Sequence, residues 1–203
     1  MRRFTIQRIA TLAATICFLG GIIFLVGCSS ITSGRLKNKE PYIHVVKETQ
    51  LAGVTASRMG IFYFANAFHG EKVGYDVANI AVDHLMSHHF VQNVALTPPA
   101  VFDDKLAVKM AVDKQYDIIL IGRVDDFYEG GISSDSRVAV SIKILNVRSG
   151  QLLWYLTGAI QGKGTDTEDY FLFEKKGCPA PSAYSLVVKL LEAMLNEVIS
   201  KNS

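Results

Sequence analysis

Two histidines are spaced so that they could share a metal ion. His84 and His88 lie in the stretch 73–89, whose apolar residues repeat with helical period, so both imidazoles fall on one side of a helix. A zinc site needs a third protein ligand, and no sequence motif around these residues supplies one. We therefore expect ordinary histidines on an amphipathic helix and no metal site.

Other site chemistry has weaker support. One loop carries four acidic residues, Asp125, Asp126, Glu129 and Asp135. Their spacing is not that of a calcium-binding EF-hand, which favours a solvated, charged loop. No serine or cysteine stands in a nucleophile motif such as G-x-S-x-G. The sequence predicts a protein that is not an enzyme and that needs no cofactor.

The clearest chemical signal is a cysteine that carries lipid. The residues LVGC, ending at Cys28, close the apolar run 9–26, which follows a basic start without acidic residues. This arrangement resembles a bacterial lipobox, where a signal peptidase cuts before a cysteine that carries a diacylglycerol. An uncleaved transmembrane helix is the alternative, since about 18 apolar residues can span a bilayer. Gly20-Gly21 weakens a long helix, so lipidation is favoured.

Lipidation would decide where the protein lies. Two or three acyl chains on Cys28, palmitate among them, would hold the chain on a membrane without crossing it. In families with this motif, a serine after the cysteine, here Ser29, is typical of outer-membrane sorting. We expect a lipid-anchored protein on the periplasmic face of the outer membrane, with the inner membrane as the alternative.

Removal of residues 1–27 changes the charge balance. Lys plus Arg falls from 21 to 18 against 19 Asp plus Glu, so the formal charge becomes −1 instead of +2. A nucleic-acid partner is therefore not supported. Cys178 would be the cysteine left unmodified, which excludes an intrachain disulfide. It is either a free thiol or a bridge to another chain.

The composition divides the chain into three parts. Residues 1–27 are a signal peptide, 28–56 are a lipidated flexible linker, and 57–203 are a single globular domain. Residues 42–46 alternate weakly and could add an edge strand.

The patterns in the domain predict the order β-α-β-α-β-β-β-α, which is a mixed sheet of the α/β (α+β) class. Ile118–Gly122 is apolar throughout and predicts a central strand buried on both faces. Residues 138–144 alternate between apolar and polar, which predicts an antiparallel strand with one wetter face. The apolar stripe of 186–198 predicts a helix that covers the sheet.

Three finer expectations concern the ends and faces of elements. The second strand, 90–96, should end at Thr97-Pro98-Pro99. Leu106 should point inward from the next helix, together with Met110 and Ala111. Residues 162–181 should form a long irregular loop, which is unusual in a compact domain and therefore a candidate for function.

Three segments carry a family resemblance. Residues 117–122, 138–147 and 148–154 resemble the amino-terminal domain of TolB, and equally the lipoproteins of the LpoB and CsgG type. The resemblance spans about 58–199, and its motifs mark a fold and a hairpin, not a catalytic site. It implies an envelope lipoprotein that binds other proteins.

Two aromatic groups are candidate partner contacts, because loops placed by a rigid sheet are the usual contact sites. Phe127 and Tyr128, beside Gly130-Gly131, form the first group. The second group is the apolar run in the long loop: Tyr170, Phe171, Leu172 and Phe173. Alternatively, this loop folds back over the sheet and buries these side chains.

Two functions remain open. The favoured one is a protein-binding adaptor or assembly factor for an envelope machine, such as a cell-wall synthase or a flagellar or secretion apparatus. The alternative is a homo-oligomer in which this chain is one subunit of a secretion ring or pore of the curli type. Such pores need inserted hairpins with strands of about 9–11 residues. The connections in this chain are short, which favours the adaptor.

Overall fold

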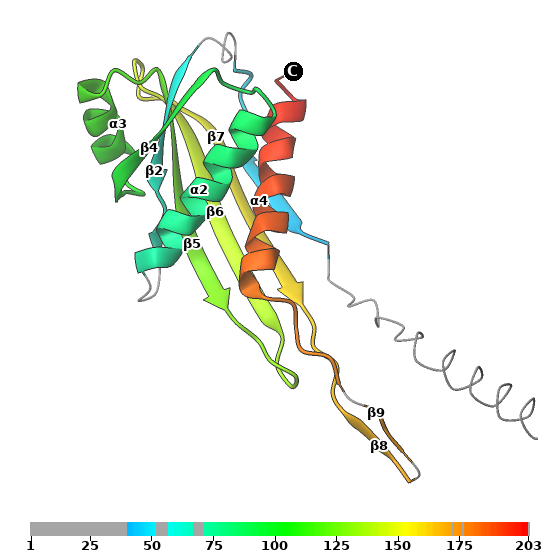
Figure 1. Cartoon of the computed structure of the whole chain (residues 1–203). Helices are drawn as coiled ribbons and strands as arrows, with labels where there is room; N and C mark the ends of the chain where they lie inside the picture. Colours follow the sequence, from blue (N-terminus) through cyan, green and yellow to red (C-terminus); the bar gives the residue numbers. More distant parts are fainter. Residues whose placement is uncertain (1–39, 52–56, 67–70, 172, 176, 203) are drawn as a thin grey trace, which may run out of the picture. The chain divides into compact units, whose positions relative to one another are not determined.

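A mixed sheet of seven strands lies at the centre of the computed structural model, which describes residues 40–51, 57–66, 71–171, 173–175 and 177–202 (Figure 1). These residues belong to one unit, Leu36–Ser203. The strands are β1 (Tyr42–Lys47), β2 (Arg58–Tyr63), β3 (Ala65–Asn66), β4 (Asn93–Ala100), β5 (Ile118–Tyr128), β6 (Ser136–Asn146) and β7 (Leu152–Gly162). Their order across the sheet is β1-β7-β6-β5-β2-β4, and β3 pairs with β5.

The helices are α2 (Glu71–Ser87), α3 (Asp104–Asp113) and α4 (Ala183–Ser200). β2, β4 and β5 are parallel and need helical crossovers, whereas β5, β6, β7 and β1 are antiparallel. The tight turn between β6 and β7 contains Gly150 at φ +66°, a conformation that glycine adopts readily. The order β2-α2-β4-α3-β5-β6-β7-α4 confirms the predicted order and the mixed α+β class.

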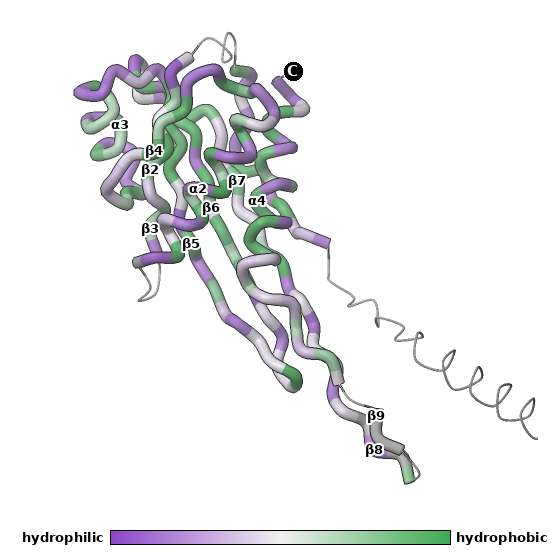
Figure 2. The backbone as a smooth tube through the Cα atoms, viewed as in Figure 1, coloured by the Kyte–Doolittle hydropathy of each residue, from purple (hydrophilic) through white to green (hydrophobic). Residues whose placement is uncertain are grey.

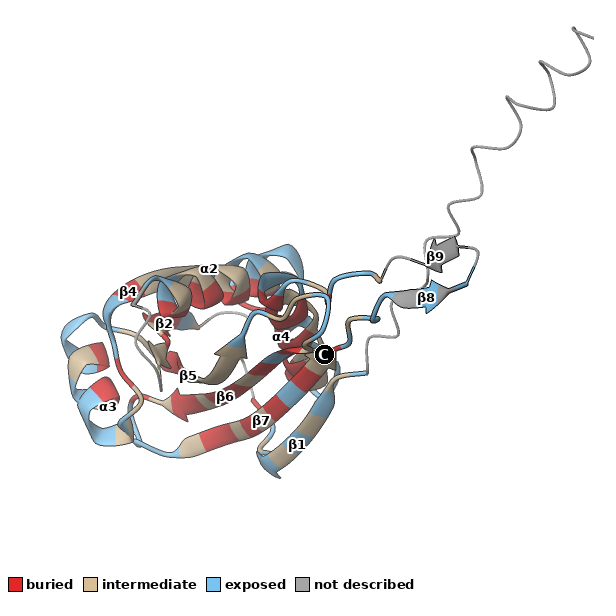
Figure 3. Ribbon diagram, turned by 90° about the horizontal axis from the view of Figure 1, so that it is seen from below, coloured by how far each residue is buried: buried red, intermediate tan, exposed pale blue. Residues whose placement is uncertain are grey.

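The main core lies between one face of the sheet and the helices α2 and α4. Figure 3 shows these two helices over that face, with their buried residues turned toward it. Ile118, Leu120 and Val124 of β5 point into this core. The apolar stripe of α4 is buried along its whole length, which confirms that it packs on the sheet.

The opposite face has a smaller core. Ile119 and Ile121 of β5 point to this side, where Ala107 and Ala111 of α3 cover them. β5 is therefore buried on both faces, as its apolar run predicts. α3 covers only part of this face and touches β6 at one end, and the described helices leave most of the neighbouring surface of β6, β7 and β1 uncovered (Figure 3). We call that surface the open face.

The edge strand expected at 42–46 is confirmed as β1, whose backbone pairs with β7, so this part of the segment 28–56 is not linker. Two further expectations need correction. β4 does not end before Pro98-Pro99 but continues to Ala100. It is an edge strand whose register with β2 shifts at the two prolines, and edges and bulges are the places where a strand tolerates proline. Leu106 of α3 is exposed and does not point inward.

The segment between β7 and α4 is not simply an irregular loop. It contains a second, two-stranded sheet formed by β8 (Glu168–Tyr170) and β9 (Phe173–Lys175). Figure 1 shows this hairpin beyond the end of β7. Among the described residues, no helix is both long and apolar enough to cross a membrane.

Candidate protein-binding surfaces

Phe127 and Tyr128, predicted together as a loop contact, lie on opposite faces of β5. The Phe127 ring packs edge-to-face on Tyr184 of α4, with ring centroids 5.1 Å apart. Tyr184 donates a hydrogen bond of 3.3 Å to Asp76 of α2. Burial raises the pKa of Tyr184, and the negative charge of Asp76 raises it further. Phe127 is therefore half-buried at the junction of the sheet with both helices.

Tyr128 is more accessible and faces the open side. It pairs with Arg137 across β5 and β6. The Arg137 guanidinium lies over the Tyr128 ring, 5.2 Å from its centroid. The ring remains 44% exposed, so Tyr128 can contact a partner while Phe127 serves the core.

The acidic residues near this loop bond to neighbouring elements. Asp125 accepts hydrogen bonds from Arg123 Nε and Ser141 Oγ. Glu129 accepts a 2.7 Å bond from the backbone N–H of Ala183, at the start of α4. Asp135 likewise accepts one of 2.7 Å from Gln161. These carboxylates link the loop to β6, β7 and α4, while Glu129 remains exposed and the Asp126 side chain is 49% exposed, as expected of a solvated loop.

The two histidines predicted on one helical side do stand together. The rings of His84 and His88 have centroids 4.3 Å apart. His84 Nε2 lies 3.0 Å from Asn196 Oδ1 of α4, and His88 Nδ1 lies 2.9 Å from the His84 carbonyl oxygen. Within the described ranges, no three His, Cys, Asp or Glu side chains are grouped so that they could hold a metal ion.

The β8–β9 hairpin carries the second predicted contact. Tyr170 of β8 pairs with Phe173 of β9, and Phe171 at the turn is 103% exposed. Figure 2 shows this apolar tip at the far end of the hairpin. The alternative in which the loop buries its rings therefore does not hold for Phe171. The Tyr170 and Phe173 side chains and all of Leu172 lie outside what the structure describes, as does Cys28.

The base of the hairpin is held by backbone bonds. Thr165 N–H donates to the Cys178 carbonyl at 2.9 Å, and Cys178 N–H donates to Thr165 Oγ1 at 2.8 Å. Ala180 N–H donates to the Gly131 carbonyl in the β5–β6 loop at 2.9 Å. The Cys178 thiol is exposed and free. The hairpin thus starts from a fixed base and presents Phe171 at its tip.

A cavity of about 300 Å³ lies on the open face near the same end of the sheet. Ala139 and Ala159 are paired across β6 and β7 and form its floor, while Tyr42 of β1 and Asp126 of β5 continue the same row. Further lining comes from Glu40, Arg137, Val138, Ile160 and Gln161. The sequence pointed to a wetter face on β6, but it could not show that two alanines would meet side by side.

Farther along the open face, a cation links α3 to the sheet. Lys143 Nζ lies 2.7 Å from Asp104 Oδ1. It also lies 4.7 Å from the ring centroid of Phe102 and 5.5 Å from that of Tyr155. Lys143 is thereby fixed by an ion pair and two aromatic rings, which makes it part of the scaffold.

Solved structures share this fold. The PelC dodecamer from Paraburkholderia phytofirmans aligns with a TM-score of 0.60 and 16% identity, over 80% of this chain and 99% of that chain. At that identity the similarity concerns the fold alone. No family model matches the chain, and the search of curated proteins gave no match.

Weaker similarities include two further bacterial proteins. Lipoprotein GNA1162 from Neisseria meningitidis aligns with a TM-score of 0.42 and 14% identity, over 71% of this chain and 99% of that chain. The LpoB C-terminal domain from Escherichia coli aligns with a TM-score of 0.40 and 14% identity, over 54% of this chain and 86% of that chain. These scores are too low to carry an argument. The resemblance to TolB and to CsgG-type lipoproteins stays a prediction.

Proposed function

We propose that this protein is an envelope lipoprotein that acts as a protein-binding adaptor or assembly factor. A lipid on Cys28 holds it on the periplasmic face of the outer membrane, and its function is not catalytic. The observation that carries the binding function is Phe171, a fully exposed aromatic side chain at the tip of a hairpin with a fixed base. Exposed aromatic residues are favoured anchors of protein interfaces.

The partner in this proposal belongs to an envelope machine, such as a cell-wall synthase or a flagellar or secretion apparatus. Two contact points are available near one end of the sheet: Phe171 on the hairpin and Tyr128 on the open face. The anchor supports this function because a tethered protein meets envelope partners at a raised effective concentration.

Photocrosslinking in intact cells tests the adaptor. A photoreactive residue replaces Tyr128, Phe171 or, as a matched control, Val112, which is 57% exposed on the outside of α3. We expect the first two positions to capture one dominant foreign protein and Val112 to capture none. Cys28→Ser should release the chain from the membrane and abolish the capture. Equal capture from all three positions would contradict the proposal.

A ring of identical subunits is the second candidate function. It is favoured by the PelC dodecamer, whose chain is covered over 99% of its length by this fold. The same photocrosslinking separates the two candidates. A ladder of self-crosslinked chains that ends at a defined size supports the ring, whereas a single foreign band supports the adaptor.

A further inference from the structure

We propose that the tip of the β8–β9 hairpin docks, through Phe171, into the open-face cavity of a second copy of this chain. The inference deepens the ring candidate and rests on it. In this contact, Phe171 of one copy fills the open-face cavity of the next copy.

The cavity has the size and lining for one aromatic side chain. Its volume of about 300 Å³ lies at the lower end of the range of about 300–1,000 Å³ typical of ligand pockets. Ala139 and Ala159 leave a depression because their side chains are short, and Tyr42 stands beside it with 69% of its surface exposed. A phenyl ring placed there would lie on two methyl groups and against a tyrosine ring.

Phe171 is a side chain that would gain from burial in this cavity. It is fully exposed in its own chain, although an aromatic side chain can bury about 150–250 Å². The β8–β9 hairpin extends beyond the end of β7 (Figure 1), so its tip can reach a shallow cavity on another copy.

Among the described residues that line the cavity, the charged ones are Glu40, Asp126 and Arg137, so its one cation is the group that can meet an acidic residue of the hairpin. Asp169 is exposed and lies in β8, two residues before Phe171 in the chain. At the cavity, the Arg137 guanidinium is only 3.7 Å from Asp126 and its side chain is 56% exposed. It offers five N–H donors in all, so it can also bind the carboxylate of an incoming Asp169.

A second copy is the occupant that fits this pairing. Every chain carries one hairpin tip and one cavity, and the two surfaces differ. Such a head-to-tail contact repeats from copy to copy and closes into a ring when the rotation permits. Each copy in a ring is held at two contacts, which compensates for the small area of one contact.

Disulfide trapping in intact cells tests the contact. The full lipidated chain carries Cys178→Ser, together with Phe171→Cys and Ala159→Cys, both at exposed positions. We expect an oxidant to give a ladder of covalent multimers that a reductant collapses. The matched control carries Phe171→Cys and Val112→Cys and should give no ladder. In the chain with native cysteines, Ala159→Trp fills the cavity and should abolish the multimers formed by an amine-reactive crosslinker, while Val112→Trp should not.

The outcomes distinguish the proposed docking contact from ring formation in general. If the cysteine pair gives no ladder but the amine-reactive crosslinker still gives multimers, the docking contact is wrong and the ring stands. If neither gives multimers, the ring candidate fails and the inference fails with it. A Phe171→Cys side chain that is trapped on a foreign protein instead overturns the inference in favour of the adaptor.

Discussion

Phe127 and Tyr128 show how a single backbone irregularity sets the role of a residue. The pairing of β5 with β6 shifts between Val124 and Asp126, so Asp125 is an extra residue in the strand. A bulge of this kind reverses the faces of all residues after it. Val124 and Phe127 consequently share the helix-covered face, and Tyr128 turns to the open face.

The different surroundings of two phenylalanines lead to a prediction. Phe127→Ala should lower the free energy of unfolding by about 2 kcal/mol, roughly half the cost of removing a fully buried ring, because Phe127 packs on Tyr184. Phe171→Ala should change it by less than about 0.5 kcal/mol, as for other surface positions. Denaturant unfolding of both variants measures the difference. Equal destabilisation would mean that Phe171 belongs to the core.

At the scale of the element, α4 is the main cover of the sheet, and its first turn is held by two acceptors. Ser182 Oγ accepts from Ser185 N–H at 3.2 Å, and Glu129 Oε2 accepts from Ala183 N–H at 2.7 Å. The first acceptor is local and visible in the sequence as a helix cap. The second comes from the end of β5, so it also fixes the start of α4 against the sheet.

Removal of either acceptor should destabilise the protein. We expect Ser182→Ala to cost about 1 kcal/mol, the usual value of a cap. Glu129→Ala should cost about 1–2 kcal/mol, because it removes a hydrogen bond to a charged group. Glu129→Gln is the matched control and should cost less, since its amide oxygen can still accept. Chemical unfolding measures all three. If Glu129→Ala left the free energy of unfolding unchanged, this would show that the bond does not stabilise the helix.

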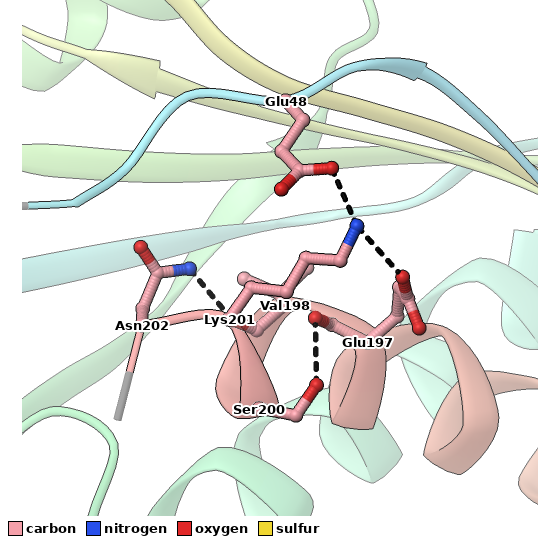
Figure 4. A network of polar contacts seen from close by, with 6 residues as sticks. All are labelled: Glu48, Glu197, Val198, Ser200, Lys201 and Asn202. Atoms are coloured by element: carbon pink, nitrogen blue, oxygen red, sulfur yellow. Dashed lines mark hydrogen bonds and ion pairs between the residues drawn. The ribbon is translucent and has the colours of Figure 1, made fainter.

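At the scale of the whole molecule, the end of α4 fastens the segment that follows the edge strand β1. Lys201 forms ion pairs with Glu48 and, at 3.1 Å, with Glu197 (Figure 4). Asn202 accepts a 2.6 Å hydrogen bond from Leu51 N–H and donates one of 2.6 Å to the Val198 carbonyl. This network joins two regions about 150 residues apart in sequence and holds β1 in the sheet.

The network predicts a pH dependence. The hydrogen bonds of Lys201 to Glu48 and then to Glu197 raise its pKa above the ordinary value. A raised folded-state pKa adds stability that is fully present below the ordinary lysine pKa of about 10.4 and is lost as the pH rises through the folded value. Lys201→Met should therefore lower Tm slightly at pH 8, and its difference from the parent should vanish at high pH.

Thermal unfolding of the parent and the variant across this pH range measures the effect. Tyr184, whose pKa is also raised, makes the protein lose stability at high pH, but this loss is common to both chains and cancels in the difference. Lys109→Met on the exposed side of α3 is the control. If the difference in Tm between Lys201→Met and the parent persisted unchanged at high pH, this would refute the role of the Lys201 charge.

The sequence by itself determined the local features of this protein. The apolar run of β5, the alternation of β6 and the stripe of α4 depend on residues close together in the chain. Periodicity and capping act over one or two turns or strand lengths, so these elements and their order could be predicted.

Only the tertiary structure decided the features that depend on distant segments. The edge strand expected at 42–46 finds its partner in β7, more than 100 residues later, and β4 tolerates Pro98-Pro99 because it is at the edge. The open-face cavity exists because Ala139 and Ala159 meet across two strands, and the bulge at Asp125 places Phe127 on the helix-covered face and Tyr128 on the open face. Register and edge position follow from the packing of the whole sheet, and no local pattern encodes them.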